Sequence, residues 1–177
     1  MKLMDVITEN RKYEYGCVML YFDFPEIEKL HSQIKNEDIY HNPNDPSFGL
    51  ETEPHTTLLF GLHPEVTDEN VQKVLSNHQF GTCHISNSSF FDNPEYDVLK
   101  FDVSGDSLHE CNSDLRKYPY TSNFPDYHPH MTIGYLNKGM GKKYTKLFEN
   151  HQHTLIPQYA VYSKPDGSKT KFKINLK

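Results

Sequence analysis

Two short stretches of the sequence place a histidine and a threonine two residues apart in matching surroundings. In P-H-T-T-L-L-F (residues 54–60) and P-H-M-T-I-G-Y (residues 129–135), proline, histidine, threonine, an aliphatic residue and an aromatic residue occupy the same five offsets. A third histidine at this spacing, His84 with Ser86, has no preceding proline and runs into polar residues. Chance alone gives roughly 1.4 such spacings in this chain, so the shared surroundings indicate one motif used twice.

Histidine and threonine at this spacing are suited to breaking a phosphodiester bond. Side chains alternate along a strand, so His55 and Thr57 project from one face, as do His130 and Thr132. Two such strands side by side would surround one phosphorus atom. An imidazole, with an ordinary pKa of about 6.5, can act as base or acid, and threonine hydroxyls can stabilise charge on the phosphate oxygens. The structural alternative is a pair of buried histidines hydrogen-bonded to the threonines.

The predicted elements place each motif at the start of a strand, once in each half of the chain. Strand, helix and strand follow one another in both halves, and no linker composition divides them. We therefore expect a single α+β domain over residues 1–177, made of two similar lobes, each with an antiparallel sheet and helices. Strands are expected at 16–24, 55–62, 82–91, 96–104, 130–136, 154–163 and 169–176, and helices at 25–34, 68–78 (capped by Thr67), 106–118 and 141–149.

Composition and charge argue against several classes of protein. A net charge of −6 disfavours a protein that coats long nucleic acid through its phosphates. No stretch is long enough to span a membrane, and residues 1–16 lack the apolar core of a secretory signal, so a cytoplasmic protein is expected. Cys17, Cys83 and Cys111 are odd in number and widely spaced, which favours reduced structural thiols.

Lysines are concentrated near the end of the sequence. Residues 138–177 contain nine lysines and only two acidic residues, whereas the rest of the chain is acidic. Such a face is typical of an edge strand protected by charge. The alternative is attraction of a small anionic ligand to a site near these lysines. For Lys164, within the S-K-P-D-G-S turn, we expect a solvated position more than a phosphate contact.

Two His-x-His pairs, at residues 128–130 and 151–153, raise the possibility of a metal site. No cluster of aspartate, glutamate or cysteine accompanies either pair at the spacing of metal ligands. We therefore expect neither a metal nor another cofactor. His128 is expected to lie beside the site and to influence the charge near His130.

The sequence resembles the two-histidine phosphoesterases, a superfamily marked by paired His-x-[Ser/Thr] motifs that includes 2′-5′ RNA ligase-like proteins and cyclic phosphodiesterases. The likeness runs through YFDFPEIEKL, PHTTL, FFDNPEYDVLKFDVS and PHMTIGYL, in that order. At FPDYHPHMTIGY and HTT the chain is most similar to phage anti-CBASS cyclic-oligonucleotide phosphodiesterases, which destroy the nucleotide messengers of a bacterial immune system. This resemblance implies a bilobal fold with the active site in the cleft between the lobes.

The resemblance also implies roles for particular residues. His55 and His130 would be base and acid, in an order that the sequence does not fix, and Thr57 and Thr132 would hold the phosphate. The chain has no tryptophan, so any stacking on substrate bases must use tyrosine or phenylalanine. The candidates for this substrate-binding role are Phe124, Tyr127, Tyr21 and Tyr162.

The implied activity is metal-independent hydrolysis of a cyclic di- or trinucleotide messenger, in the host cytoplasm if the protein comes from a phage. One alternative keeps the chemistry and changes the substrate to linear 2′-5′ oligoadenylate or to an RNA end with a cyclic phosphate, as in 2′-5′ RNA ligase-like enzymes. Another alternative is a non-catalytic module that sequesters a nucleotide. The sequence does not indicate base preference, ring size, linkage or oligomeric state.

Overall fold

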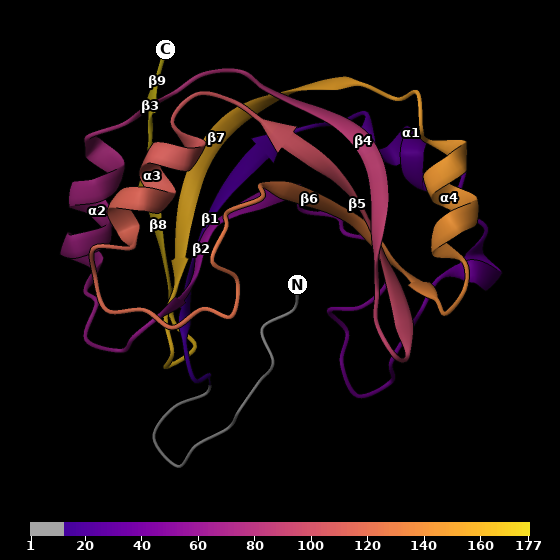
Figure 1. Cartoon of the computed structure of the whole chain (residues 1–177), viewed down its shortest axis with the longest axis horizontal. Helices are drawn as coiled ribbons and strands as arrows, with labels where there is room; N and C mark the ends of the chain where they lie inside the picture. Colours follow the sequence, from indigo (N-terminus) through magenta and orange to yellow (C-terminus); the bar gives the residue numbers. More distant parts are fainter. Residues whose placement is uncertain (1–12) are drawn as a thin grey trace.

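A computed structural model describes residues 13–177, which form one large curved sheet with helices on its outer side (Figure 1). The sheet has seven strands in the order β2-β1-β7-β4-β5-β6, with β8 paired to β7, and all of these pairs are antiparallel. A separate parallel pair joins β3 to β9. The strands are β1 (Gly16–Asp23), β2 (His55–Leu62), β3 (Gln79–Phe80), β4 (Cys83–Asp92), β5 (Tyr96–Ser104), β6 (His130–Asn137), β7 (His153–Ser163), β8 (Lys169–Lys173) and β9 (Asn175–Leu176).

The expected two lobes are present, and β7 belongs to both of them. Its first three residues, His153 to Leu155, pair with β4 in one lobe. Its later residues pair with β1 on one side and with β8 on the other. The α+β class and the antiparallel pairing are therefore confirmed, and the two lobes are halves of one continuous sheet.

The sheet is curved so strongly that its two end strands, β2 and β6, meet (Figure 1). The hydroxyl of Thr56 in β2 donates a hydrogen bond of 2.9 Å to the carbonyl oxygen of His130 in β6. These are the strands that open with the two His-x-Thr motifs. The curvature therefore brings together motifs that are far apart in the sequence.

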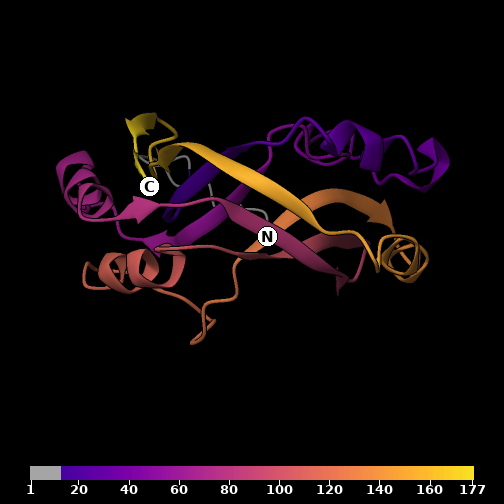
Figure 2. The same cartoon turned by 90° about the horizontal axis from the view of Figure 1, so that it is seen from above.

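The helices cover the outer side of each lobe (Figure 1). Figure 2 shows from above that α2 and α3 lie at one end of the molecule and α4 at the other. Thr67 caps α2 through a reciprocal capping box with Asn70, as the sequence predicted. The helices are α1 (Ile27–His31), the short 3₁₀ helix η1 (Asn36–Asp38), α2 (Asp68–Ser76), α3 (Leu108–Leu115) and α4 (Gly141–Leu147).

Two expected elements differ from the structure. The helix expected at 25–34 ends at His31, because the backbone N–H of Lys35 bonds the Tyr144 hydroxyl at 2.9 Å and the chain turns away. The strand expected at 169–176 breaks after Lys173. Lys173 pairs with Tyr159 of the antiparallel strand β7, so the residues after Lys173 would meet residues before Tyr159. Pro157, two residues before Tyr159, has no N–H with which to extend the ladder.

The remaining expectations concern the surface of the protein. The lysines of β8 are exposed along an edge strand, in agreement with the prediction of a charged edge. Among residues 13–177, no helix has the length and apolar character needed to cross a membrane. The expectation that residues 1–16 contain no secretory signal falls mostly on residues 1–12, which lie outside the described part of the chain.

Candidate active site

The His-x-Thr strand of the first lobe, β2, contains a β-bulge directly after its threonine. Thr57 pairs with Met19 of β1, but the next pair joins Leu59 to Val18, so Leu58 is an extra residue without a partner. A bulge of this kind shifts the alternation of side chains by one residue. Phe60, five residues after His55, therefore projects from the same face as the histidine.

The strand of the second lobe, β6, contains the same bulge at the same offset. Thr132 pairs with Lys100 of β5 and Gly134 pairs with Leu99, which leaves Ile133 as the extra residue. Tyr135, five residues after His130, is thereby turned to the face of the motif. The shared aromatic position in the two sequence stretches is explained by this bulge, because a regular strand would direct it to the opposite face.

Side chains from neighbouring elements satisfy the carbonyl groups of both bulges. The amide of Asn112, a buried residue of α3, donates a hydrogen bond of 2.6 Å to the carbonyl oxygen of Leu58. In the other lobe, Nε2 of His31 lies 2.9 Å from the carbonyl oxygen of Ile133. A carbonyl can only accept, so this ring nitrogen carries the proton. The geometry of each motif is thus supported from outside its own strand.

The two motif histidines are oriented in the same way. Nδ1 of His55 lies 2.8 Å from the carbonyl oxygen of Glu53, and Nδ1 of His130 lies 3.0 Å from that of His128. Because the carbonyl oxygens are acceptors, both Nδ1 atoms are protonated and both Nε2 atoms are available for proton transfer. His128 thus acts on His130 through its backbone.

One small pocket contains both motifs. It brings together two histidines from opposite lobes, and the charge on His55 contributes to lowering the pKa of His130. This placement of the four predicted catalytic residues agrees with the expectation of a site between the lobes. The pocket is lined by Glu51, His55, Thr57, His130, Thr132 and Tyr135.

The surroundings of His130 favour the neutral imidazole. Burial is the main cause, with smaller contributions from the nearby charges of Lys100 and His55, and the pKa of His130 falls to about 4. Lys100 is fixed above the ring of Phe91 and donates hydrogen bonds to Ser89 at 2.7 Å and Asp102 at 3.3 Å. At neutral pH Nε2 of His130 is therefore unprotonated, which is the state that a general base requires.

Aromatic rings flank the pocket on both sides. In the first lobe, Tyr21 stacks on His55 with ring centroids 5.0 Å apart, and Tyr159 stacks on Tyr21 at 5.2 Å. The ammonium of Lys171 lies 3.9 Å from the centre of the Tyr159 ring, so one lysine of the C-terminal region does approach the site. In the second lobe, Phe91 meets His130 edge to face at 5.2 Å.

The predicted stacking residues occupy different environments. Tyr21 is beside the pocket, whereas Tyr162 is fully buried and its hydroxyl donates to the carbonyl oxygen of Val66 at 2.8 Å. The expectation of substrate stacking for Tyr162 is therefore wrong, because its alternation along β7 directs it into the core. Tyr127 is half-buried, and its hydroxyl donates to the backbone oxygen of Thr57 at 2.8 Å, which indicates a supporting position.

Phe124 and Lys164 lie away from the catalytic pocket. Phe124 is 56% exposed on a loop and lines a second pocket. Lys164 forms hydrogen bonds with Asp68 at 3.0 Å and Thr170 at 3.1 Å, so its ammonium is used within the first lobe.

Sequence reasoning missed five residues at or beside the site, which are Glu51, Phe91, Lys100, Tyr135 and Tyr159. Tyr135 could have been found, because it occupies the aromatic position shared by both motifs. Lys100 lies on β5, which pairs with β6, and Phe91 lies on β4, the next strand of the sheet, so their proximity to His130 depends on sheet pairing that the sequence does not specify. Glu51 reaches the pocket because residues 49–51 bond the free edge of β6.

The His-x-His pairs were the candidates for a metal site. In the second pair, Nδ1 of His151 lies 3.3 Å from Nε2 of His153. Within residues 13–177, no three side chains of histidine, cysteine, aspartate or glutamate form a group that could hold a metal ion.

The three cysteines are buried free thiols, and burial raises the pKa of each to about 12.

The fold and the paired motifs define the class of structure: the chain has the two-histidine phosphoesterase fold. It is similar to Usb1 of Kluyveromyces marxianus, with a TM-score of 0.55 and 11% identity over 91% of this chain and 98% of that chain. That Usb1 has also been solved with uridine monophosphate.

Two further solved structures show the same likeness. The MHV ns2 PDE domain matches with a TM-score of 0.54 and 17% identity over 92% of this chain and 99% of that chain. TT0787 of Thermus thermophilus matches with a TM-score of 0.51 and 14% identity over 91% and 99%. No family model and no curated protein matches the sequence. At these identities the comparisons show the fold, and the function has to be argued from the site.

Proposed function

We propose that the protein is a phosphodiesterase of the two-histidine type that cleaves cyclic oligonucleotide messengers by acid–base catalysis. The observation that carries this proposal is the common pocket of His55 and His130. Each ring is anchored through Nδ1 to a backbone carbonyl, which leaves both Nε2 atoms available for the substrate. The reaction needs two proton transfers on opposite sides of one phosphorus, and the two lobes provide one imidazole each.

In the first step, His130 is the base and His55 is the acid. His130 is neutral at pH 7, so its Nε2 accepts the proton of the ribose 2′-hydroxyl. The 2′-oxygen forms a bond to phosphorus while the bond from phosphorus to the 5′-oxygen breaks. The departing 5′-oxygen receives the proton from Nε2 of His55, and the ring opens to a linear product with a 2′,3′-cyclic phosphate.

In the second step, the proton transfers are reversed. Nε2 of His55, now unprotonated, takes a proton from water, and the resulting oxygen attacks the phosphorus of the cyclic phosphate. His130, now protonated, donates to the departing ribose oxygen. Both histidines return to their starting states. For a 2′-5′ linkage the same scheme uses the 3′-hydroxyl as the attacking group.

The threonines and Lys100 stabilise the charge that grows on the phosphate. Thr57 and Thr132 line the same pocket as the histidines, and their hydroxyls can donate to the non-bridging oxygens. Lys100 pairs directly with Thr132 across β5 and β6 and adds a positive charge on the base side of the site. Each hydroxyl would contribute roughly a hundredfold to the rate.

The choice of a cyclic oligonucleotide rests on the sequence resemblance and on the surroundings of the site. Tyr21 with Tyr159 on one side and Phe91 on the other offer aromatic surfaces for the nucleosides joined by the phosphodiester. A nucleotide ligand is also consistent with the uridine monophosphate complex of Usb1. An anti-CBASS role for a phage protein in the host cytoplasm follows from the resemblance. The net charge of −6 favours action on small nucleotides over long nucleic acid.

Two alternatives keep the site and change its use. Linear 2′-5′ oligoadenylate, or an RNA end with a cyclic phosphate, presents the same phosphorus chemistry and would be recognised by the same groups. A module that only sequesters a nucleotide would bind without turnover, although the neutral state of His130 favours catalysis over simple anion binding.

The test is to incubate the protein with cyclic di- and trinucleotides, 2′-5′ oligoadenylates and RNA ends with a cyclic phosphate, in the presence of EDTA. We expect a cyclic substrate to yield a linear product with a 2′,3′-cyclic phosphate, identified by mass. His55→Ala and His130→Ala should each lower turnover by at least about a hundredfold while the far-UV circular dichroism is unchanged. An intact ligand after incubation, or activity that disappears with EDTA, would contradict the proposal.

A further inference from the structure

A second pocket lies along the same face of the first lobe as the catalytic motif. Its link to the site is Phe60, which the bulge at Leu58 turns to the side of His55 and Thr57. Phe60 packs against the same small cluster of buried residues as Tyr21, whose ring stacks on His55. The pocket is lined by Glu14, Tyr15, Phe60, Thr121, Ser122, Asn123 and Phe124.

One wall of this pocket consists of connected rings. Tyr15 meets Phe60 edge to face at 6.1 Å and stacks on His63 at 5.8 Å. His63 is fixed by a hydrogen bond of 2.8 Å between its Nε2 and the Thr121 hydroxyl. Gly61 has a φ of +110°, and an added Cβ would lie 2.0 Å from the Thr121 carbonyl oxygen. The loop that contains Thr121 is therefore in close contact with the end of β2.

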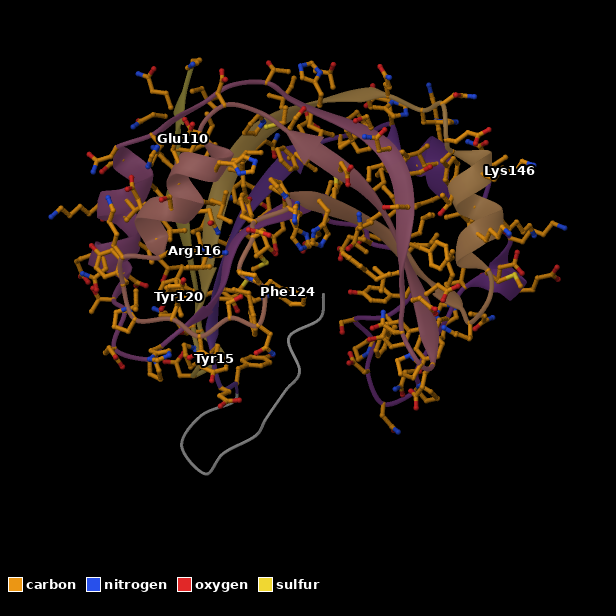
Figure 3. All side chains as sticks on the ribbon, viewed as in Figure 1. Tyr15, Glu110, Arg116, Tyr120, Phe124 and Lys146 are labelled. Carbon is orange, nitrogen blue, oxygen red and sulfur yellow. The ribbon has the colours of Figure 1, made fainter. Side chains whose placement is uncertain are left out.

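Phe124 also lines the pocket, and its backbone is fixed while its ring is exposed. The guanidinium of Arg116 donates to the carbonyl oxygens of Pro125 at 2.9 Å and Phe124 at 3.4 Å. The Ser122 hydroxyl lies 3.1 Å from the Phe124 backbone N–H. Phe124 nevertheless remains 56% exposed, and Figure 3 shows it on the side of its lobe that faces the other lobe. Because Phe124 shares one pocket with Tyr15 and Phe60, its exposed ring belongs to an aromatic patch of the kind that marks a contact surface.

We propose that this pocket binds the base of an additional nucleotide, one unit beyond the two nucleosides joined by the scissile phosphodiester. The inference rests on the proposed function and deepens it, because it implies a substrate of at least three nucleotides. Tyr21 beside His55 serves the nearer base. Phe60 pairs with Cys17, four residues before Tyr21 on β1, which is roughly 13 Å along the strand and places the pocket beyond that first base.

The chemistry of the lining fits a planar heteroaromatic base. Phe60, Tyr15 and Phe124 provide aromatic surface on which a base can stack, and such stacking accepts any base because every base has a π-face. The Ser122 hydroxyl is engaged with the backbone N–H and carbonyl oxygen of Phe124. The side-chain amide of Asn123 lines the same pocket and can form hydrogen bonds with the polar edge of the base.

The experiment compares a trinucleotide with a dinucleoside monophosphate of the linkage that the wild-type protein cleaves. Phe124→Ala should lower kcat/KM for the trinucleotide about tenfold, within the range for loss of one stacking contact, and leave the dinucleoside monophosphate unchanged. Phe124→Trp should restore the preference. Ile156→Ala is the matched control, because Ile156 is 55% exposed on β7 and lies outside the lining of both pockets.

A binding measurement separates failure of this inference from failure of the proposed function. A trinucleotide carrying 2-aminopurine loses fluorescence when its base stacks, so wild-type protein should quench it more strongly than Phe124→Ala. Equal quenching by the two proteins, or equal loss of activity on both substrates, would overturn the inference. Stronger quenching by the wild type without any turnover would support the pocket and reject the phosphodiesterase activity.

Discussion

At the level of single residues, charge distinguishes two motifs that are otherwise duplicates. Lys100 lies on the strand beside His130 and contributes to lowering its pKa, whereas the carboxylate of Glu51 lines the pocket that holds both histidines. The bonds from Nδ1 to a carbonyl oxygen are the same in both motifs. The assignment of His130 as base therefore depends on its burial and on this neighbouring cation.

Replacing Lys100 with methionine should raise the pKa of His130. The expected shift is only part of the way from about 4 towards the ordinary value of 6.5, because burial is the larger cause. The acidic limb of the plot of kcat/KM against pH should move to higher pH, and the histidine Cε1–H resonance should titrate accordingly. Lys169→Met, on the edge strand β8, is the control. If the acidic limb of the pH profile did not move, the proposed effect of Lys100 on the catalytic His130 would be wrong.

The sequence identified the four residues of the paired motifs but not the neighbouring residues that influence them. His55, Thr57, His130 and Thr132 share one strand spacing, which is visible along the chain. Lys100 is thirty residues from His130, and only the pairing of β5 with β6 makes them neighbours. Tyr162 was misassigned for the same reason, since the sequence does not show which face of β7 points to the core.

At the level of elements, the two bulges determine what each motif strand presents to the site. Each bulge directs the aromatic residue at the fifth offset to the face of the histidine and threonine. In the second lobe this residue is Tyr135, which lines the catalytic pocket, and in the first lobe it is Phe60, which lines the second pocket. The aromatic position shared by the two motifs was visible in the sequence. The face to which it points depends on the register of β2 against β1 and of β6 against β5.

Asn112→Ala should disturb the bulge of β2 from outside the active site. The variant leaves the buried carbonyl of Leu58 without its 2.6 Å hydrogen bond, which should cost about 1–3 kcal/mol of unfolding free energy. Because Thr57 is adjacent, kcat should fall more than KM rises. Urea denaturation and steady-state kinetics provide the two measurements.

The control for this prediction is Ser88→Ala. It removes a side-chain hydrogen bond of comparable type, 2.7 Å long, to the carbonyl oxygen of Thr145 at α4. Equal kinetic effects in the two variants would show that Asn112 contributes stability alone.

Most element boundaries were predicted within a few residues, and the two exceptions arose from tertiary contacts, at Tyr144 and Pro157, that local sequence does not contain.

At the level of the whole molecule, the shared strand β7 and the contact between β2 and β6 make the two lobes one structural unit. The bond from Thr56 to His130 links the ends of the sheet next to the catalytic groups. The alternation of strands and helices was sufficient to predict two similar lobes. It could not show that one strand serves both lobes, because strand pairing across long sequence separations leaves no local signal.

We expect residues 13–177 to unfold in a single cooperative transition whose free energy falls as the pH is lowered. In the folded state the pKa of His130 is about 4, below its ordinary value of 6.5, so the unfolded chain binds this proton more readily. The contribution of His130 to the free energy of unfolding is fully present above pH 6.5 and decreases towards pH 4, by up to about 3 kcal/mol.

Urea titrations monitored by fluorescence and circular dichroism at several pH values would check both statements. The His130→Gln variant should show a smaller loss of stability between neutral and acidic pH. Transitions that differ between the two probes would indicate that the lobes unfold separately, and an equal pH dependence in the variant would assign the effect to other groups.

The burial of all three thiols has a practical consequence for observing the protein at work. Cys17, Cys83 and Cys111 are inaccessible and stay protonated at ordinary pH, so maleimide reagents should leave the native chain unlabelled. A cysteine introduced on either lobe would then be the sole attachment point for a spectroscopic reporter. With one such cysteine on each lobe, paired reporters could measure whether the distance between the lobes changes when a nucleotide binds, without removing any native cysteine.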